Sequence, residues 1–324
     1  MKITEEKREK KKFNIFNMNK DGKGVYEVES RKPTLGFFFK LYFRKFTHLL
    51  QLNLLMLVMV IPLIAILFIY LMGDKTPTVT DPVYTPLIGI ATSSPTPKLF
   101  NTLDLSSIQM EVPVFSQTSI IVIIALLVFM AITWGWQSVG SAYVLRGLFR
   151  GDPVFVFSDY FYGIKRNFKQ AFFLGLIDFV ITAVLIVDFS YFSNMTGSFA
   201  MDFMYYATIA MLIIWIMMRF YIYNLLVTFE LKNFKIIKNS FIFSMLGIKR
   251  NFMALLGIVL LIVLHVMLIF VLLPIGISIP LVLPFVYIIS TFGFMATYAA
   301  FPVIQKYMID PYADAISEEN NEIE

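Results

Sequence analysis

The chain has 324 residues, of which 58% are hydrophobic and only 15% are charged, and its mean hydropathy is +0.74. A soluble domain carries about 25% charged residues, so this composition excludes an ordinary soluble protein. The absence of cysteine excludes disulfides, thiolate catalysis and cysteine-bound metals. The two histidines, His48 and His265, lie far apart, so we expect neither a metal centre nor a cofactor.

Six apolar runs are long enough to cross a bilayer, since about 20 apolar residues span its hydrocarbon core. They predict an all-α polytopic membrane protein with six transmembrane helices. The membrane domain covers about 47–307, between a basic tail at 1–46 and an acidic tail at 308–324. The predicted spans lie at about 48–72, 118–145, 170–191, 204–229, 252–274 and 279–307.

The first two spans are joined by a long segment, 73–117, that is rich in proline, threonine and serine. This composition predicts an extended or partly ordered external loop. A simple spacer and a binding lid are both compatible with it.

Lysine and arginine are distributed very unevenly between the two sides of the predicted spans. On one side lie 24 of the 27, and the opposite side keeps only Lys75 and Lys98. This asymmetry predicts a multi-pass protein with both termini cytoplasmic. The lysine-rich, cysteine-free composition indicates that the membrane is the bacterial cytoplasmic membrane. We expect the basic stretch Lys7–Lys12 to contact anionic lipid rather than nucleic acid.

The hexapeptide GIKRNF occurs twice, at Gly163–Phe168 and at Gly247–Phe252, with an offset of 84 residues. An apolar stripe with spacings of 4, 3 and 4 residues accompanies each copy, which places each stripe on one helical face. The stripe residues are Phe157, Phe161, Ile164 and Phe168 in the first copy, and Phe241, Met245, Ile248 and Phe252 in the second.

Each stripe leads directly into a span, which predicts two cytoplasmic amphipathic elbow helices in a parallel internal repeat. The elbow motif comprises Lys165, Arg166, Asn167 and Phe168, and again Lys249, Arg250, Asn251 and Phe252. We expect each asparagine near the bend into the span, hydrogen-bonded to freed backbone groups. The elbows serve either as membrane anchors alone or also as docking surfaces for a cytoplasmic partner.

Three ionisable residues within spans are candidates for function, because charges are costly in a bilayer. Asp178 and Arg219 lie about 12 and 15 Å from the inner ends of neighbouring antiparallel spans, at about 1.5 Å per residue. They could form a structural ion pair, a gating or substrate-contacting pair, or no pair. His265 is interpreted as a helix–helix hydrogen bond or a proton relay. Gly135 and Gly140 suggest close helix packing.

The stretch SVGSAYVLRGLFRGDPVFVFSDYFYGIKRNFKQAF, at 138–172, resembles the signature of the YesL family of bacterial integral membrane proteins. The N-terminal stretch 21–55 is similar to the clostridial branch of that family, although the 73–117 segment is longer than expected of short members. The resemblance, which spans most of 21–307, implies an accessory role in sugar uptake. It also implies partners among the components of a carbohydrate importer of the ABC class.

Motifs for catalysis are missing: there is no Walker A, GxSxG, HExxH or paired-carboxylate pattern. We therefore expect no catalytic residues and no enzyme activity. The predicted function is a non-catalytic membrane protein, accessory to oligosaccharide uptake or sensing. The alternatives are a secondary transporter in its own right and a structural membrane protein without a transport role.

Overall fold

The computed structural model describes residues 33–73, 75–77, 111–195 and 198–312. Three sequence-based predictions fall wholly or largely outside these residues. They concern the basic stretch at 7–12, most of the external segment and most of the acidic tail.

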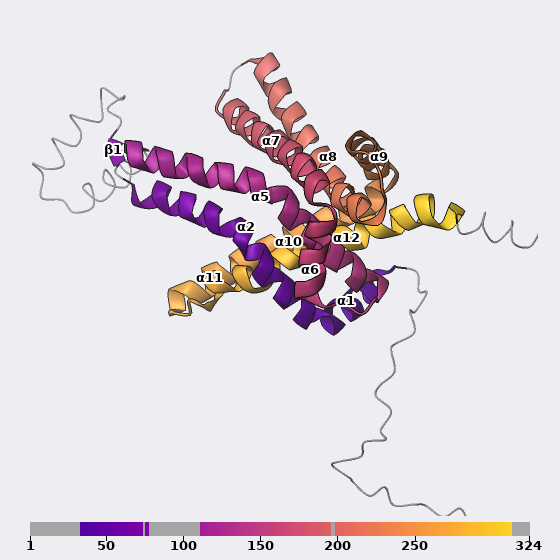
Figure 1. Ribbon diagram of the computed structural model, residues 1–324. Coiled ribbons are helices and arrows are strands. Elements are labelled where there is room, and N and C mark those ends of the chain that lie inside the picture. The colour runs from indigo at the N-terminus through magenta and orange to yellow at the C-terminus, as the bar shows by residue number, and fades with distance from the viewer. Residues whose placement is uncertain (1–32, 74, 78–110, 196–197, 313–324) are drawn as a thin grey trace, which may run out of the picture. The chain divides into compact units, whose positions relative to one another are not determined.

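Long apolar helices dominate the described residues, six of them long and apolar enough to cross a membrane, and confirm the predicted all-α polytopic fold (Figure 1). Five crossings are single helices: α2 (Phe46–Met72), α5 (Gln117–Arg150), α7 (Phe168–Ser193), α8 (Phe199–Thr228) and α10 (Ile248–Leu272). The sixth is a chain of shorter elements: α11 (Ile279–Leu283), η2 (Pro284–Ile288), α12 (Ile289–Ile304) and η3 (Gln305–Ile309). A short turn, η1 (Leu273–Ile275), ends α10.

Three shorter helices each precede a pair of spans that forms a helical hairpin. They are α1 (Leu35–Arg44), α6 (Val156–Arg166) and α9 (Asn233–Leu246). A single hinge residue separates each from its span, and its φ and ψ are −104° and 10° at Lys45, −113° and 21° at Asn167, and −90° and 14° at Gly247. The described chain therefore consists of three elbow–hairpin units with the same bend.

Helix α1 is an elbow that the sequence did not predict, because the predicted boundary placed 1–46 in a tail. Helix α1 is capped by Thr34, whose hydroxyl accepts a hydrogen bond from the Phe37 amide at 3.3 Å. Phe38 and Leu41 are buried, and the Tyr298 hydroxyl donates to the Thr34 carbonyl at 2.6 Å. Helix α1 is thus packed against the membrane domain.

Because every hairpin leaves and returns, α1, α6 and α9 all lie at one end of the spans, which we call the elbow end. The opposite end, the turn end, carries the connections within the hairpins. There β1 (Lys75–Pro77) and β2 (Glu111–Pro113) pair antiparallel, with Lys75 opposite Pro113. This pairing brings the two ends of the 73–117 segment together.

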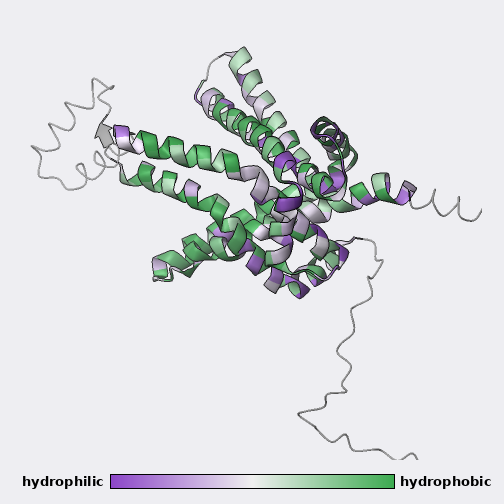
Figure 2. Ribbon diagram, in the orientation of Figure 1, coloured by the Kyte–Doolittle hydropathy of each residue, from purple (hydrophilic) through white to green (hydrophobic). Residues whose placement is uncertain are grey.

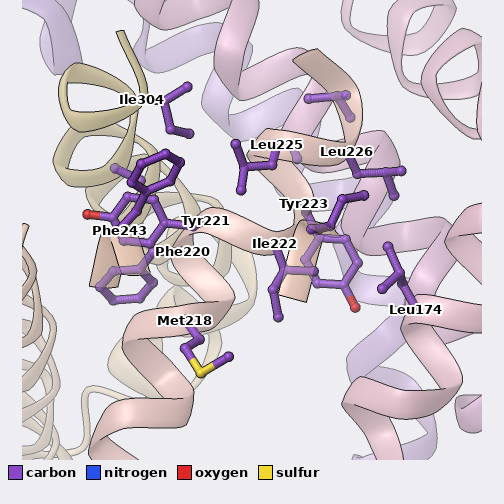
Figure 3. Close-up of a cluster of buried hydrophobic side chains, with 14 of the residues drawn as sticks. Leu174, Met218, Phe220, Tyr221, Ile222, Tyr223, Leu225, Leu226, Phe243 and Ile304 are labelled. Atoms are coloured by element: carbon purple, nitrogen blue, oxygen red, sulfur yellow. The ribbon is translucent and has the colours of Figure 1, made fainter. Parts of the chain in front are cut away.

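Helix α8 is the centre of the packing. Its most apolar stretch is 56% buried, against 6% for α2 and for α10, and it contacts α5, α7, α9 and α12. Figure 3 shows Tyr221 and Tyr223 pointing to opposite sides of α8, with Leu174 on the Tyr223 side and Phe243 on the Tyr221 side. Hydrophobic residues cover the long helices, while hydrophilic ones gather around α1 and α6 (Figure 2).

The crossing of α5 and α7 depends on two glycines that face each other. A Cβ atom on Gly135 would collide with the Ala171 carbonyl, and one on Gly175 with the backbone of Gly135. Gly140 is likewise covered by the Tyr160 ring, 2.8 Å from where its Cβ would lie. The close packing expected at Gly135 and Gly140 is therefore present.

The sixth crossing is interrupted by a π turn, and a polar residue of α2 holds it. Asn53 is fully buried; its amide nitrogen donates to the Phe285 carbonyl at 2.6 Å and its amide oxygen accepts from the Ser290 amide at 2.9 Å. A side chain that bonds backbone groups in this way accompanies irregular turns within helices. Asn53 thus fixes the irregular turn to the first hairpin.

Candidate functional site

A buried carboxylate lies where α5, α7 and α8 meet. Asp178 is only 1% exposed. The Arg219 Nε group lies 2.9 Å from its Oδ1 atom and donates a hydrogen bond to its Oδ2 atom at 3.1 Å. The Trp134 indole nitrogen donates to Oδ2 at 2.8 Å, and the Tyr223 hydroxyl donates to Oδ2 at 2.7 Å. We call these four side chains the Asp178 cluster.

Further contacts fix the donors of the cluster in place. The Thr182 hydroxyl lies 3.4 Å from Asp178 Oδ1 and itself accepts from the Trp215 indole at 3.0 Å. The Arg219 guanidinium carbon lies 5.1 Å from the centroid of the Trp134 ring, an arrangement that favours a cation. The carboxylate is saturated with donors, which suits a lock between three helices more than acid–base chemistry.

The structure brings the sequence-predicted pair, Asp178 and Arg219, into contact. Sequence reasoning missed Trp134 and Tyr223 as partners. One signal was available, because Tyr223 follows Arg219 by four residues and therefore shares its helical face. Trp134 comes from another hairpin, and only the Gly135–Gly175 crossing brings it within reach of Asp178.

The two copies of the hexapeptide lie on opposite sides of their hinges. In the first, residues 163–166 end α6 and Asn167 is the hinge; in the second, Gly247 is the hinge and residues 248–252 begin α10. The copies are thus displaced by about one helical turn relative to the bend. The asparagine, expected near the bend in both copies, is itself the hinge in the first copy and lies one turn beyond the hinge in the second.

The reason for the displacement lies in the packing of the second hinge. A Cβ atom at Gly247 would collide with the Tyr221 hydroxyl and lie 3.0 Å from a Val303 methyl, so Tyr221 would have to move to admit a side chain. Asn251 is fully buried; it accepts from the Tyr221 hydroxyl at 2.8 Å and donates to the Ser244 carbonyl at 2.9 Å. Asn251 lies one turn inside the span, and from there it satisfies a carbonyl that is freed at the end of α9.

At the first hinge, Asn167 is only partly buried and donates from its side chain to the Gly163 carbonyl at 3.1 Å. Both asparagines therefore bond backbone carbonyls at the end of an elbow helix, although the Gly163 carbonyl also accepts the Asn167 backbone amide at 3.3 Å. Asn251 in addition ties two hairpins together through Tyr221.

The basic residues of the two copies also differ in their surroundings. Lys165, Arg166 and Lys249 are exposed. Arg250 is partly buried and donates to the Tyr298 carbonyl at 3.4 Å, and its buried Nε has no partner within the described residues. The first copy offers two basic side chains to the surroundings, and the second offers one.

Most residues of the apolar stripes are exposed, although Phe168 also stacks on Trp136 and Ile164 packs partly against the core. Phe168 and Phe252, their last members, are 49% and 59% exposed, and Phe157, Phe161 and Phe241 are also exposed. The elbows are buried on other faces, α6 through Val156, Tyr160 and Gly163, and α9 through Ile236, Ser240, Phe243 and Ser244. The stripes are therefore available to acyl chains.

Two titratable groups near the hinges lie outside the spans. At the first unit's hinge, burial lowers the pKa of the Lys45 ammonium and the neighbouring Arg44 lowers it further, while Asp152 acts in the opposite direction. Burial also raises the pKa of the Tyr160 hydroxyl, which stays protonated under the Gly140 face of α5.

His265 is buried and lies 2.8 Å, through Nε2, from the Pro280 carbonyl. A carbonyl can only accept, so Nε2 carries the proton. This contact joins α10 to α11, the helix–helix hydrogen bond of the sequence analysis. Within the described residues Nδ1 has no partner, and a proton relay would need one.

A hollow of about 530 Å³ opens beside the Asn167 hinge, between the start of α7 and the end of α8. Arg166 and Lys232 line it, as do the amide side chains Asn167 and Gln170. The Gln170 amide donates to the Leu231 carbonyl at 2.5 Å, and Arg146 donates to the Val227 carbonyl at 2.5 Å. These bonds tie α5 to the end of α8 and α7 to the segment that follows α8.

Fold and polar contacts together define an all-α polytopic integral membrane protein in which a buried, fully bonded carboxylate pairs with the partly exposed Arg219. Across the described segments, no group of three or more histidine, aspartate or glutamate side chains could hold a metal ion. Comparison with known protein families, curated proteins and solved structures finds no match for this chain.

Proposed function

We propose that this chain is a non-catalytic protein of the bacterial cytoplasmic membrane, accessory to carbohydrate uptake or sensing. Its elbow end faces the cytoplasm, as the concentration of lysine and arginine on that side supports. The resemblance of 138–172 to the YesL family supports the carbohydrate role. The saturated Asp178 carboxylate supports the absence of acid–base catalysis.

One observation carries the proposed docking role: the elbow helices are buried on one face and keep basic side chains exposed on another. Lys165 on α6, Lys238 on α9 and Lys249 at the start of α10 are all exposed at the elbow end. Such a surface complements an acidic patch on a cytoplasmic subunit of an importer of the ABC class.

Uptake of labelled oligosaccharides in cells that lack this protein tests the proposal. We expect uptake to fall on deletion and to recover with the wild-type chain. The double variant Lys165→Glu/Lys238→Glu should reach the membrane but fail to restore uptake. Asp202→Lys, which reverses an exposed charge at the turn end, should restore it. Unchanged uptake of every oligosaccharide on deletion would contradict the accessory role.

A secondary transporter is the second candidate, because Asp178 and Arg219 form a charged pair inside the spans. The purified chain in proteoliposomes would then move ions or labelled oligosaccharides without a partner, and Asp178→Asn would abolish that flux. A structural membrane protein would show neither flux in proteoliposomes nor an uptake defect on deletion.

A further inference from the structure

Two cations, Arg166 and Lys232, line the hollow beside the Asn167 hinge, and the one carboxylate that also lines it, Glu230, is loosely held. Arg166 Nη2 lies 3.8 Å from Glu230 Oε1, and the Glu230 side chain is 95% exposed. An exposed pair at this distance contributes little free energy. A ligand anion can therefore replace Glu230 at the Arg166 guanidinium, whose planar fork matches phosphate oxygens.

The hollow lies at the level where the chain enters and leaves the spans. Helix α7 begins at Phe168 and α8 ends at Thr228, and the hollow lies between these two points. The exposed Phe168 ring adjoins the hinge, and Phe229 lines the hollow. A bilayer lipid is arranged in the same way, with an anionic headgroup directly above apolar chains.

The amides of the hollow provide a neutral part of the site. Asn167 and Gln170 use their NH₂ groups on the Gly163 and Leu231 carbonyls. Their side-chain carbonyl oxygens remain as acceptors, and acceptors beside two cations suit a phosphate that carries hydroxyl groups.

We propose that this hollow binds the phosphate of an anionic headgroup, with Arg166 and Lys232 holding the phosphate from two sides. The second copy of the hexapeptide does not form such a site, because its Arg250 is engaged with the Tyr298 carbonyl. The proposal goes beyond the docking role, since it concerns Arg166 and Lys232 and a phosphate ligand rather than a partner protein.

The full chain, purified in a mild zwitterionic detergent, allows a direct test with three ligands: phosphatidylglycerol, phosphatidylcholine and inorganic phosphate. Native mass spectrometry counts the bound lipid, and thermal stability is measured in parallel. We expect phosphatidylglycerol to bind more tightly than phosphatidylcholine. Arg166→Gln/Lys232→Gln should weaken phosphatidylglycerol binding at least tenfold, as two charge-assisted contacts are lost.

Two further variants make the test specific. Arg150→Gln is the matched control, because Arg150 is also 48% exposed and also pairs loosely, at 3.6 Å, with Asp152. It should bind phosphatidylglycerol like the wild type. Glu230→Gln should strengthen binding about two- to threefold, since it removes the competing carboxylate.

Three results decide the source of the phosphate and whether the proposal holds. Inorganic phosphate could displace the lipid from the wild type and fail to bind Arg166→Gln/Lys232→Gln. That result would support the site and identify its ligand as a soluble phosphate. Equal phosphatidylglycerol binding by the wild type and the double variant overturns the proposal. So does an equal loss in Arg150→Gln, which would indicate a diffuse charge effect.

Discussion

At the scale of single residues, the same hexapeptide has two different structural roles. In the first copy, GIKRNF ends an elbow helix and leaves Lys165 and Arg166 exposed. In the second, it begins a span, and its asparagine and arginine contact other parts of the protein. Surroundings from distant segments, Tyr221 and Tyr298 above all, decide which role each copy takes.

Replacement of the two asparagines by alanine should therefore have unequal effects. Asn251→Ala leaves a buried tyrosine hydroxyl and the Ser244 carbonyl without partners, so it should cost about 2–3 kcal/mol of stability. Asn167→Ala removes a single contact at a half-exposed site and should cost less than about 1 kcal/mol. Thermal unfolding of each purified variant in detergent measures the difference, and equal losses would contradict the asymmetry.

The Asp178 cluster allows a second comparison at this scale. Asp178→Ala leaves the Arg219 charge without its partner inside the bilayer and should destabilise the protein by about 3 kcal/mol. Asp178→Leu/Arg219→Met removes both charges and should recover much of that loss. Both variants are compared by thermal stability in detergent. A double variant less stable than Asp178→Ala would contradict a purely structural lock.

At the scale of elements, the sequence predicted the six spans closely because long apolar runs depend on local composition alone. It also predicted two elbows, which are visible as apolar stripes before a span. It missed α1 as an elbow, because the basic residues around 35–44 resemble a tail and the packing partner Tyr298 is distant in sequence. The Asn53 contact with the π turn was missed for the same reason.

The crossing of α5 and α7 sets the position of Trp134 over Asp178. Gly175→Ala places a methyl group against the backbone of Gly135, so the helices must separate at a cost of about 2 kcal/mol. Gly257→Ala in α10 is the control, because its Cβ would lie 3.5 Å from Met295 Sδ, an ordinary contact.

Tryptophan fluorescence and thermal stability in detergent follow both glycine variants. Gly175→Ala should lower stability and change the emission spectrum, since Trp134 loses its place at Asp178. Gly257→Ala should leave the emission spectrum unchanged, and its thermal stability should equal or slightly exceed that of the wild type, because alanine favours helix. Equal behaviour of the two variants would show that the glycine contact is not needed for the crossing.

At the scale of the whole molecule, three elbow–hairpin units converge on α8 at the elbow end. The buried residues of α5, α8 and α12 lie mainly in the halves of these helices nearest that end, and many apolar residues near the turn end are exposed. Polar contacts from Tyr221, Trp134 and Asn53 join the three units. The repeat is thus threefold, and only its second and third members share a recognisable sequence motif.

The account depends most on the placement of all elbows on one side of the membrane. The natural chain lacks cysteine, so single cysteines introduced at Lys165, Lys238 and Asn194 can be labelled cleanly with a membrane-impermeant thiol reagent. In inside-out vesicles we expect Lys165→Cys and Lys238→Cys to be labelled, and in right-side-out vesicles only Asn194→Cys. Labelling of Lys165→Cys and Lys238→Cys from different sides would contradict the account.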